Sequence, residues 1–241
     1  IECYNDIDDL KDTFLQFANS VPFYGTVCAC KDSNNVASIL SKIDKPIITY
    51  GIDSQNVDIK AENLHQENGT ISFDVKVKDQ IFSVNLSVPG KYNAYNALAA
   101  LSVCETMGID LESACKALSN FSGVKRRFDI KANKNIMIID DYAHHPVEVK
   151  NVIETVKSNW NKNLNVIFQP HLFSRTKEFY KDFAKALMIA DNVMITEIFG
   201  SREKDDNFTT SDLIINEMLK LNYKNVSYVC LLYTSPSPRD V

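Results

Sequence analysis

The sequence is poor in the features that mark membrane, fibrous and DNA-binding proteins. It contains no run of 18 apolar residues, so we expect no membrane-spanning helix. Seven glycines and seven prolines in 241 residues are too few for a linker-rich or repeat architecture. A net charge of −5 argues against duplex DNA as a partner, because such proteins normally carry a basic surplus. What remains is a globular protein with one large or two modest domains.

Three common catalytic signatures are also missing from the sequence. It has no Gly-x-x-x-x-Gly-Lys-[Ser/Thr] phosphate loop, because Gly90-Lys91-Tyr92 lacks both the preceding glycine and the hydroxyl. It has no Gly-x-Gly-x-x-Gly dinucleotide fingerprint and no Gly-x-Ser-x-Gly nucleophile elbow. A chemical function must therefore be sought in other segments.

Cysteine usage indicates a reduced protein. None of the six cysteines forms a Cys-x-x-Cys pair, and most lie in apolar runs, where a thiol behaves as a small hydrophobic group. We therefore expect free thiols and a cytosolic location. Cys28 and Cys30 would share one face of a strand, which leaves a metal pair as the alternative, although no third or fourth ligand lies nearby.

Hydrophobic periodicity divides the chain into two regions with different sheets. In the first region, apolar residues alternate with polar ones in three short segments, which is typical of a half-buried antiparallel sheet. The expected helices are 6–19, 34–43, 91–107 and 110–118, and the expected strands are 26–30, 45–50, 57–59, 71–77 and 81–86.

In the second region strands and helices take turns along the chain. The expected strands are 136–140, 164–168, 192–196 and 226–230, and the expected helices are 147–158, 176–189 and 211–219. This alternation predicts βαβ units and a parallel sheet. The predicted fold class is therefore α/β, with a mixed sheet and helices followed by a Rossmann-like parallel sheet.

Polar side chains gather in the loops that follow the first three strands of the second region. These loops are 140–146, 169–176 and 197–203, and three of the four histidines fall in the first two. Ligands bind outside the carboxyl ends of the strands in open parallel sheets. We therefore expect acidic, imidazole and guanidinium groups to share one crevice.

Each group in these loops has more than one interpretation. Asp141 could bind the hydroxyls of a ribose, bind a cation or cap a helix. In the second case His144, His145 and His171 could join it as metal ligands. His145 alone is better explained as structural. Arg175 offers a planar fork for a carboxylate or a phosphate.

Three other segments are candidates for binding. Ser174 or Thr176 could cap the helix that follows the second loop, whose start favours an anion. The basic run Lys125-Arg126-Arg127 fits either phosphates or an ordinary solvated surface. Asn93 and Asn96 lie on one face of a helix start, where their amides could read a purine edge or serve as caps and packing groups.

Four motifs stand out along the chain: Pro89 to Ala100, Phe121 to Phe128, Asp140 to Pro146 and Phe168 to Thr176. In their order and spacing they resemble motifs of the Mur ligases of peptidoglycan synthesis. Within that family, the last two are similar to those of the members that join L-alanine to UDP-N-acetylmuramate.

The resemblance implies a domain organisation and a cellular role. Residues 1–123 would be the later part of a central ATPase domain, 124–230 an incomplete Rossmann-like C-terminal domain, and 231–241 a non-native tail. An N-terminal domain and the phosphate loop would precede residue 1. The implied enzyme is cytoplasmic, uses ATP and Mg²⁺, and serves cell-wall biogenesis, cell shape and division, with small-molecule substrates and neither nucleic acid nor membrane as a partner.

The resemblance also implies a nucleotide site. Asn96 and Tyr92 would bind adenine, Arg127 the ATP phosphates, and Asp141 the ribose region. Tyr92 stands where the family usually has histidine. The magnesium ligands would lie upstream of residue 1.

For the amino-acid substrate, the resemblance places Tyr142, His144 and Arg175 around L-alanine. It implies that His144, Arg175 and Arg127 are the catalytic residues. Leu172 stands where these ligases usually have arginine, so one half of the expected carboxylate clamp is absent from the sequence.

Three other functions stay open on the sequence alone. A murein-peptide ligase would join a peptide, rather than L-alanine, to UDP-N-acetylmuramate. A metal-dependent hydrolase would use Asp141, His144, His145 and His171. A nucleotide-binding module would bind ATP without any chemistry.

Overall fold

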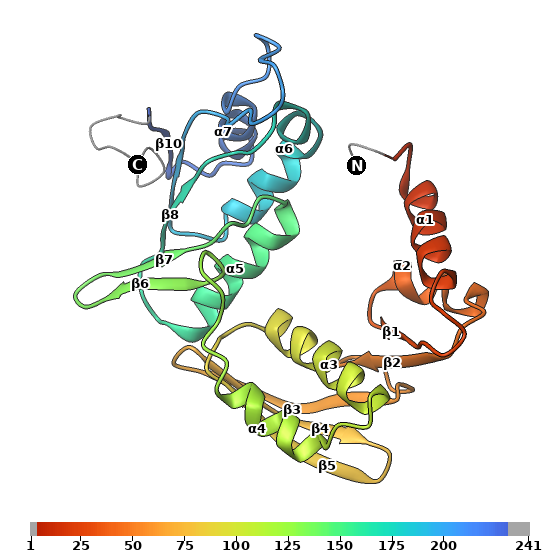
Figure 1. The fold of residues 1–241 in the computed structure, drawn as a ribbon. Coiled ribbons are helices and arrows are strands. Elements are labelled where there is room, and N and C mark those ends of the chain that lie inside the picture. The colour runs from red at the N-terminus through yellow and green to blue at the C-terminus, as the bar shows by residue number, and fades with distance from the viewer. Residues whose placement is uncertain (1–3, 231–241) are drawn as a thin grey trace, which may run out of the picture. The chain divides into compact units, whose positions relative to one another are not determined.

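The computed structural model describes residues 4–230, which form two compact units on either side of the Asp140–Asp141 bond (Figure 1). The predicted tail at 231–241 and Cys3 lie outside the described residues. The predicted domain division at residues 123/124 stays a prediction.

The first unit is a five-stranded mixed sheet with helices. Its elements are α1 (Ile7–Asn19), β1 (Val27–Cys30), α2 (Asn34–Ala37), the 3₁₀ turn η1 (Leu40–Lys42), β2 (Ile47–Gly51), β3 (Ile59–Glu67), β4 (Thr70–Val77), β5 (Gln80–Leu86), α3 (Lys91–Thr106), α4 (Leu111–Ser119), β6 (Asp129–Asn133) and β7 (Met137–Asp140). The strand order is β1-β2-β3-β4-β5, with β1, β2 and β3 parallel and the rest antiparallel.

Alternation along β3, β4 and β5 puts one face of the sheet in the core. Ile59, Ile71 and Val75 are each at most 1% exposed. Two helices cover this face (Figure 1), α3 with Leu98 and Leu101 and α4 with Leu111 and Cys115. Side chains of a strand alternate between the two faces, so the neighbouring polar residues point the other way. The predicted antiparallel part of the sheet is confirmed.

One carboxylate ties together the ends of β1, β2 and the start of α3. Asp32, just after β1, accepts hydrogen bonds from the backbone N–H groups of Ile52 (2.6 Å), Asp53 (2.9 Å) and Ser54 (2.7 Å), and from the hydroxyl of Tyr95 on α3 (2.9 Å). Burial by itself would raise the pKa of Asp32, but hydrogen bonds from Ser54 and these amides outweigh it and hold that pKa well below its usual range.

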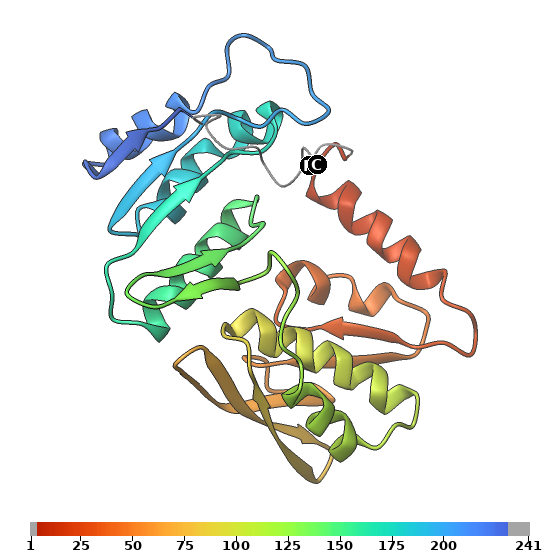
Figure 2. The same ribbon diagram turned by 60° about the vertical axis from the view of Figure 1, so that its left-hand side comes forward.

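The second unit is a parallel sheet packed against three helices. Its elements are α5 (Pro146–Asn159), β8 (Asn165–Phe168), α6 (Phe173–Leu187), β9 (Asn192–Ile195), α7 (Asp212–Lys220) and β10 (Val226–Tyr228). The strands are parallel in the order β10-β9-β8, side by side in Figure 2, and α6 packs between α5 and α7.

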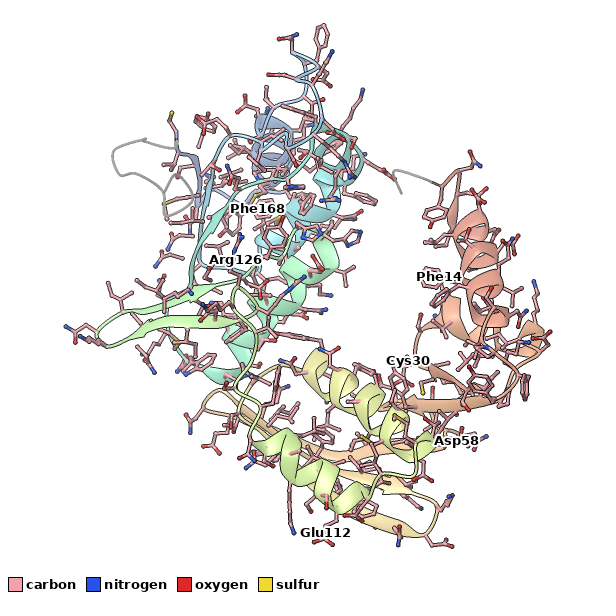
Figure 3. The ribbon with its side chains drawn as sticks, in the orientation of Figure 1. Phe14, Cys30, Asp58, Glu112, Arg126 and Phe168 are labelled. Carbon is pink, nitrogen blue, oxygen red and sulfur yellow. The ribbon has the colours of Figure 1, made fainter. Side chains whose placement is uncertain are left out.

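The core of this unit lies between the sheet and the helices. Phe183, Leu187, Ile195, Ile214 and Met218 are fully buried. The Phe168 ring at the end of β8 stands 5.2 Å from the Phe183 ring, between centroids (Figure 3). The predicted α/β class with a Rossmann-like parallel sheet is confirmed for β8, β9 and β10.

Two expected elements differ from the structure. The strand predicted at 136–140 as part of the parallel sheet is β7, which instead pairs antiparallel with β6 in a two-stranded sheet. The helix expected at 34–43 breaks into α2 and η1, because Ser38 donates its hydroxyl to the carbonyl of Asn35 and so offers the backbone an alternative to continued helix.

Among residues 4–230, no helix combines the length and the apolar composition that crossing a membrane requires. Cys28, Cys30, Cys104 and Cys115 are free thiols. Within the same range no three His, Cys, Asp or Glu side chains are grouped so that they could hold a metal ion. The metal pair considered for Cys28 and Cys30 therefore has no further ligand.

Candidate active site

In the second unit, the loops that follow β8 and β9 are joined to each other at the carboxyl ends of the strands. The N–H of Phe199 donates to the carbonyl of Pro170 (2.8 Å), and the N–H of Leu172 donates to the carbonyl of Phe199 (3.0 Å). His171 and Phe199 form a parallel bridge, and their ring centroids are 5.6 Å apart. The pairing of β8 with β9 thus continues past the strands and fixes the backbone that carries His171.

Leu172 occupies a strained position at the start of α6. Its φ is +71° and its side chain is 2% exposed. A residue with a Cβ rarely adopts this conformation, which costs about 1–3 kcal/mol. The Leu172 side chain is therefore part of the core and contributes no charge to the site.

Replacing Leu172 should show that glycine is more stable than alanine at this N-cap. Both Leu172→Ala and Leu172→Gly remove the buried side chain, but only glycine relieves the strain at φ +71°. We expect the glycine variant to be more stable than the alanine variant by about 1 kcal/mol. Urea unfolding followed by Trp160 fluorescence measures both, since Trp160 lies in the same unit; an alanine variant at least as stable as the glycine variant would contradict the strain.

Arg175, on the first turn of α6, lies against His171, in the loop just before that helix. The guanidinium NH1 of Arg175 lies 3.2 Å from Nδ1 of His171. A guanidinium can only donate, so Nδ1 of His171 is the acceptor in this contact. The contact orients the Arg175 fork, which can bind a carboxylate or a phosphate through two parallel hydrogen bonds.

His144 and Tyr142 come from the loop that precedes α5 and lie beside this pair. The ring centroid of His144 is 6.0 Å from that of His171 and 5.2 Å from that of Tyr142. Nδ1 of His144 is 2.8 Å from the carbonyl oxygen of Tyr142, so Nδ1 carries the proton and donates it. In the neutral form of the ring, Nε2 is then the nitrogen that can accept a proton.

The structure therefore brings Tyr142, His144, His171 and Arg175 together, although the strand before the first loop, β7, is not part of the parallel sheet as expected. Asp141 and His145 act locally instead. Asp141 accepts the N–H of Ala143 (2.7 Å), which stabilises the turn of the loop.

His145 is the N-cap of α5. It accepts the N–H of Val147 (3.4 Å), while Glu148 accepts the N–H groups of His144 and His145, which completes a capping box. Its ring packs on Phe179 with centroids 5.2 Å apart, and burial lowers its pKa. The interpretation of His145 as structural is confirmed.

These contacts count against the metal-dependent hydrolase. Nδ1 of His144 faces a carbonyl, Nδ1 of His145 a backbone N–H, and Nδ1 of His171 a guanidinium. A metal ion beside Arg175 would also meet like charge. Among residues 4–230 there is no group of side chains that could hold a metal ion, and this includes the predicted set Asp141, His144, His145 and His171.

In the first unit, the start of α3 carries the predicted adenine residues. Asn96 is exposed and its side-chain amide donates to the Asn93 side chain (3.3 Å), while the Asn93 amide donates to the carbonyl of Pro89 (2.7 Å). Asn93 therefore caps the turn. The Tyr92 ring folds back onto Gly90, whose φ is +102° and where a Cβ would lie 2.5 Å from the ring. The close approach makes glycine necessary at this position.

The basic run 125–127 forms a tight turn ahead of β6 (Figure 3). The N–H of Arg127 donates to the carbonyl of Val124 (3.0 Å), and the N–H of Arg126 donates to the Asp129 carboxylate (3.2 Å). Arg126 has φ +61° and its Nε lies 4.0 Å from the Asp140 carboxylate. The Arg127 side chain is exposed, as a phosphate contact requires.

Sequence reasoning missed two residues that shape the amino-acid side of the site. Phe199 supplies the backbone and the ring that hold His171. Glu203 accepts hydrogen bonds from the N–H and the hydroxyl of Ser174. The expected capping of α6 by Ser174 or Thr176 is wrong, because the N-cap is Leu172 and no side chain caps the helix from that position. The only available signal was their place in the third strand-end loop.

Comparisons with known proteins agree along most of the chain. Residues 1–104 match the Mur ligase middle domain, and residues 126–230 match the Mur ligase, glutamate ligase domain. The UDP-N-acetylmuramate–L-alanine ligase of Caldanaerobacter subterraneus subsp. tengcongensis is 38% identical over 232 residues, which are 95% of this chain and 50% of that protein. The chain thus spans about half the length of the curated relatives it matches.

Solved structures show the same fold. The UDP-N-acetylmuramate–alanine ligase of Thermotoga maritima is 28% identical, with a TM-score of 0.72 over 94% of this chain and 47% of that one. A murein peptide ligase from Psychrobacter arcticus is 24% identical, with a TM-score of 0.65 over 95% and 47%. The second of these likenesses shows the fold alone.

Proposed function

The chain belongs to the Mur ligase family, and from this we propose that it is the central and C-terminal part of a cytoplasmic ligase that joins L-alanine to UDP-N-acetylmuramate. The names of its relatives support this substrate pair. The observation that carries it is the cluster of Tyr142, His144, His171 and Arg175 at the strand ends. The product would serve peptidoglycan synthesis, and through it cell shape and division.

The γ-phosphoryl group of ATP passes to the muramate carboxylate, which leaves ADP and forms an acyl phosphate. The amine of L-alanine then attacks the acyl carbon, so that the amide bond forms and inorganic phosphate leaves. Arg175 binds the carboxylate of L-alanine through its fork, which His171 orients. Tyr142, 41% exposed, closes one side of this site with its ring. Holding the amine in line with its target is the main contribution of such positioning groups.

His144 is the group that can move a proton in this proposal. With Nδ1–H donated to the carbonyl of Tyr142, the neutral ring has Nε2 as its acceptor atom. It would take a proton from the ammonium group of L-alanine and so expose the nucleophilic lone pair. Catalytic roles are thus proposed for His144 and Arg175 on the amino-acid side.

On the nucleotide side, Asn96 and Tyr92 would contact adenine, Arg127 the phosphates and Asp141 the ribose region. The exposed amide of Asn96 and the exposed guanidinium of Arg127 fit these partners chemically. No group of described residues fits a magnesium ion, and we derive no step through one. The expectation that its ligands precede residue 1 stays a prediction.

The direct test uses the full-length protein that carries this chain. We expect ATP hydrolysis that depends on both UDP-N-acetylmuramate and L-alanine, with the ligated product identified by mass spectrometry. A murein-peptide ligase would instead use the tripeptide, and a pure nucleotide-binding module would bind ATP with no product. Either of these results would overturn the proposal.

The 241-residue chain alone should show no L-alanine-dependent ATP hydrolysis. Its sequence contains no phosphate-loop motif, so it lacks the backbone cradle and the lysine that hold the β- and γ-phosphates in such enzymes. A phosphate-release assay on the chain and on the full-length protein, at equal concentration, measures the difference. Alanine-dependent turnover by the chain would show that the phosphates are held in another way.

A further inference from the structure

Glu203 reaches from the loop after β9 to the first turn of α6. Its carboxylate accepts the N–H of Ser174 (3.1 Å) and the hydroxyl of Ser174 (2.5 Å). The same loop passes close over Phe173, because a Cβ at Gly200 would lie 2.6 Å from the Phe173 ring. The start of α6 is therefore bound to a segment about 29 residues further along the chain.

This contact replaces the cap that the helix itself lacks. The first N–H groups of a helix have no partner inside it and need an acceptor. Leu172, at the N-cap, offers no side-chain acceptor. Burial alone would raise the pKa of Glu203, but hydrogen bonds from Ser174 and from the N–H of Phe173, together with the nearby charge of Arg175, lower it overall. The ionised carboxylate is thus the form that holds the helix start.

The helix start carries the group that the proposed function needs. Arg175 is the next residue after Ser174, and its guanidinium reaches back to Nδ1 of His171. Two residues just before it are anchored: Leu172 is hydrogen-bonded to Phe199, and Ser174 is hydrogen-bonded to Glu203. Both anchors come from the loop after β9, so this loop sets where the backbone of Arg175 stands and where its fork points.

We propose that Glu203 is a positioning residue for Arg175, and that it thereby sets the affinity of the site for the carboxylate of the amino-acid substrate. The inference rests on the proposed function, because it assigns that carboxylate to Arg175. Glu203 acts through Ser174 and does not touch the substrate. Its acceptor atoms matter more than its charge, since its charge offsets part of the positive potential that attracts the substrate.

The test is a set of variants in the full-length protein, with KM and kcat measured separately. We expect Glu203→Ala to raise KM for L-alanine by about 10-fold, with kcat and KM for ATP within about 2-fold of wild type, because a displaced Arg175 loses ground-state and transition-state binding alike. Glu203→Gln keeps an acceptor oxygen and should stay within about 2-fold of wild type. Ser174→Ala removes one of the two contacts and should fall between them.

The controls separate positioning from simple loss of structure. Glu154→Ala removes an exposed carboxylate of α5 and should change nothing. In the 241-residue chain, amide exchange at Phe173 and Ser174 should be faster in Glu203→Ala than in Glu203→Gln. An unchanged KM for L-alanine in Glu203→Ala, or a fall in kcat alone, would overturn this inference. A wild-type protein that does not respond to L-alanine would instead count against the proposed function.

Discussion

Replacing Arg175 by alanine is expected to raise KM for L-alanine by about 100-fold in the full-length protein. The substitution removes a charge-assisted pair of hydrogen bonds worth about 3 kcal/mol, and each 1.4 kcal/mol is a factor of about 10 in affinity. It also removes the donor that faces Nδ1 of His171, 3.2 Å away.

Two further substitutions test the geometry of that interaction. Arg175→Lys keeps the charge but not the planar fork, so its KM should lie between those of wild type and the alanine variant. Lys185→Ala removes another cation of α6, whose nearest carboxylate, on Asp182, is 3.9 Å away at the surface, and should leave KM unchanged. Steady-state kinetics with varied L-alanine gives all three values, and an Arg175→Ala enzyme with wild-type KM would remove Arg175 from the site.

Replacing Asp32 by alanine is expected to destabilise the first unit by roughly 3 kcal/mol. The carboxylate accepts three backbone N–H groups and the Tyr95 hydroxyl, and hydrogen bonds to charged groups contribute about 1.5–3 kcal/mol each without adding fully. A Cβ on Gly51 would lie 2.7 Å from an Asp32 oxygen, which shows how closely the backbone approaches this carboxylate.

The measurement has to report on the first unit alone. Trp160, the single tryptophan, lies in the second unit, so native-state amide exchange of the β2 and α3 backbone is the suitable probe. Asp53→Ala is the matched control, because Asp53 is exposed and pairs only with side chains, those of Lys91 and Tyr95. Equal protection in the two variants would contradict the role given to Asp32.

The effect of pH on this contribution has a definite sign. The pKa of Asp32 is lowered in the folded chain, so its stabilisation is fully present above the unfolded pKa of about 4 and is lost as pH falls further. Wild type and Asp32→Ala should therefore converge in acid. A difference in stability between wild type and Asp32→Ala that stays constant down to pH 2 would mean that the Asp32 carboxylate does not cause the stabilisation.

Regular elements with a buried face could be predicted from the sequence, and elements without one could not. The strands and helices of the second unit each place apolar residues at their characteristic spacing, and they form as expected. The strand β6 was missed because its sequence, Asp129-Ile130-Lys131-Ala132-Asn133, buries almost nothing and is held mainly by hydrogen bonds to β7. With that partner unrecognised, β7 was assigned to the wrong sheet.

The residues of the site can likewise be divided into those that the sequence predicted and those that it did not. His171 and Arg175 were predicted because their loop follows β8, a strand of the parallel sheet, whereas Tyr142 and His144 lie beside them although the strand before their loop, β7, belongs to another sheet. Phe199 and Glu203 were not predicted, since their contacts depend on the path of an irregular loop, which no periodicity records. The hydrogen bond from the Tyr95 hydroxyl to Asp32 joins residues that are 63 positions apart in the sequence. It could not be predicted either, because burial of the Tyr95 ring alone does not require this hydroxyl contact.

The carboxylate of Asp32 also limits where ATP can be held. Consecutive backbone N–H groups at the end of a parallel strand form a concave cradle of the kind that receives phosphate in many nucleotide-binding proteins. In this chain, Asp32 fills the cradle made by residues 52–54. A triphosphate arriving there would have to displace a resident negative charge, so the amides of residues 52–54 are not available to hold phosphate.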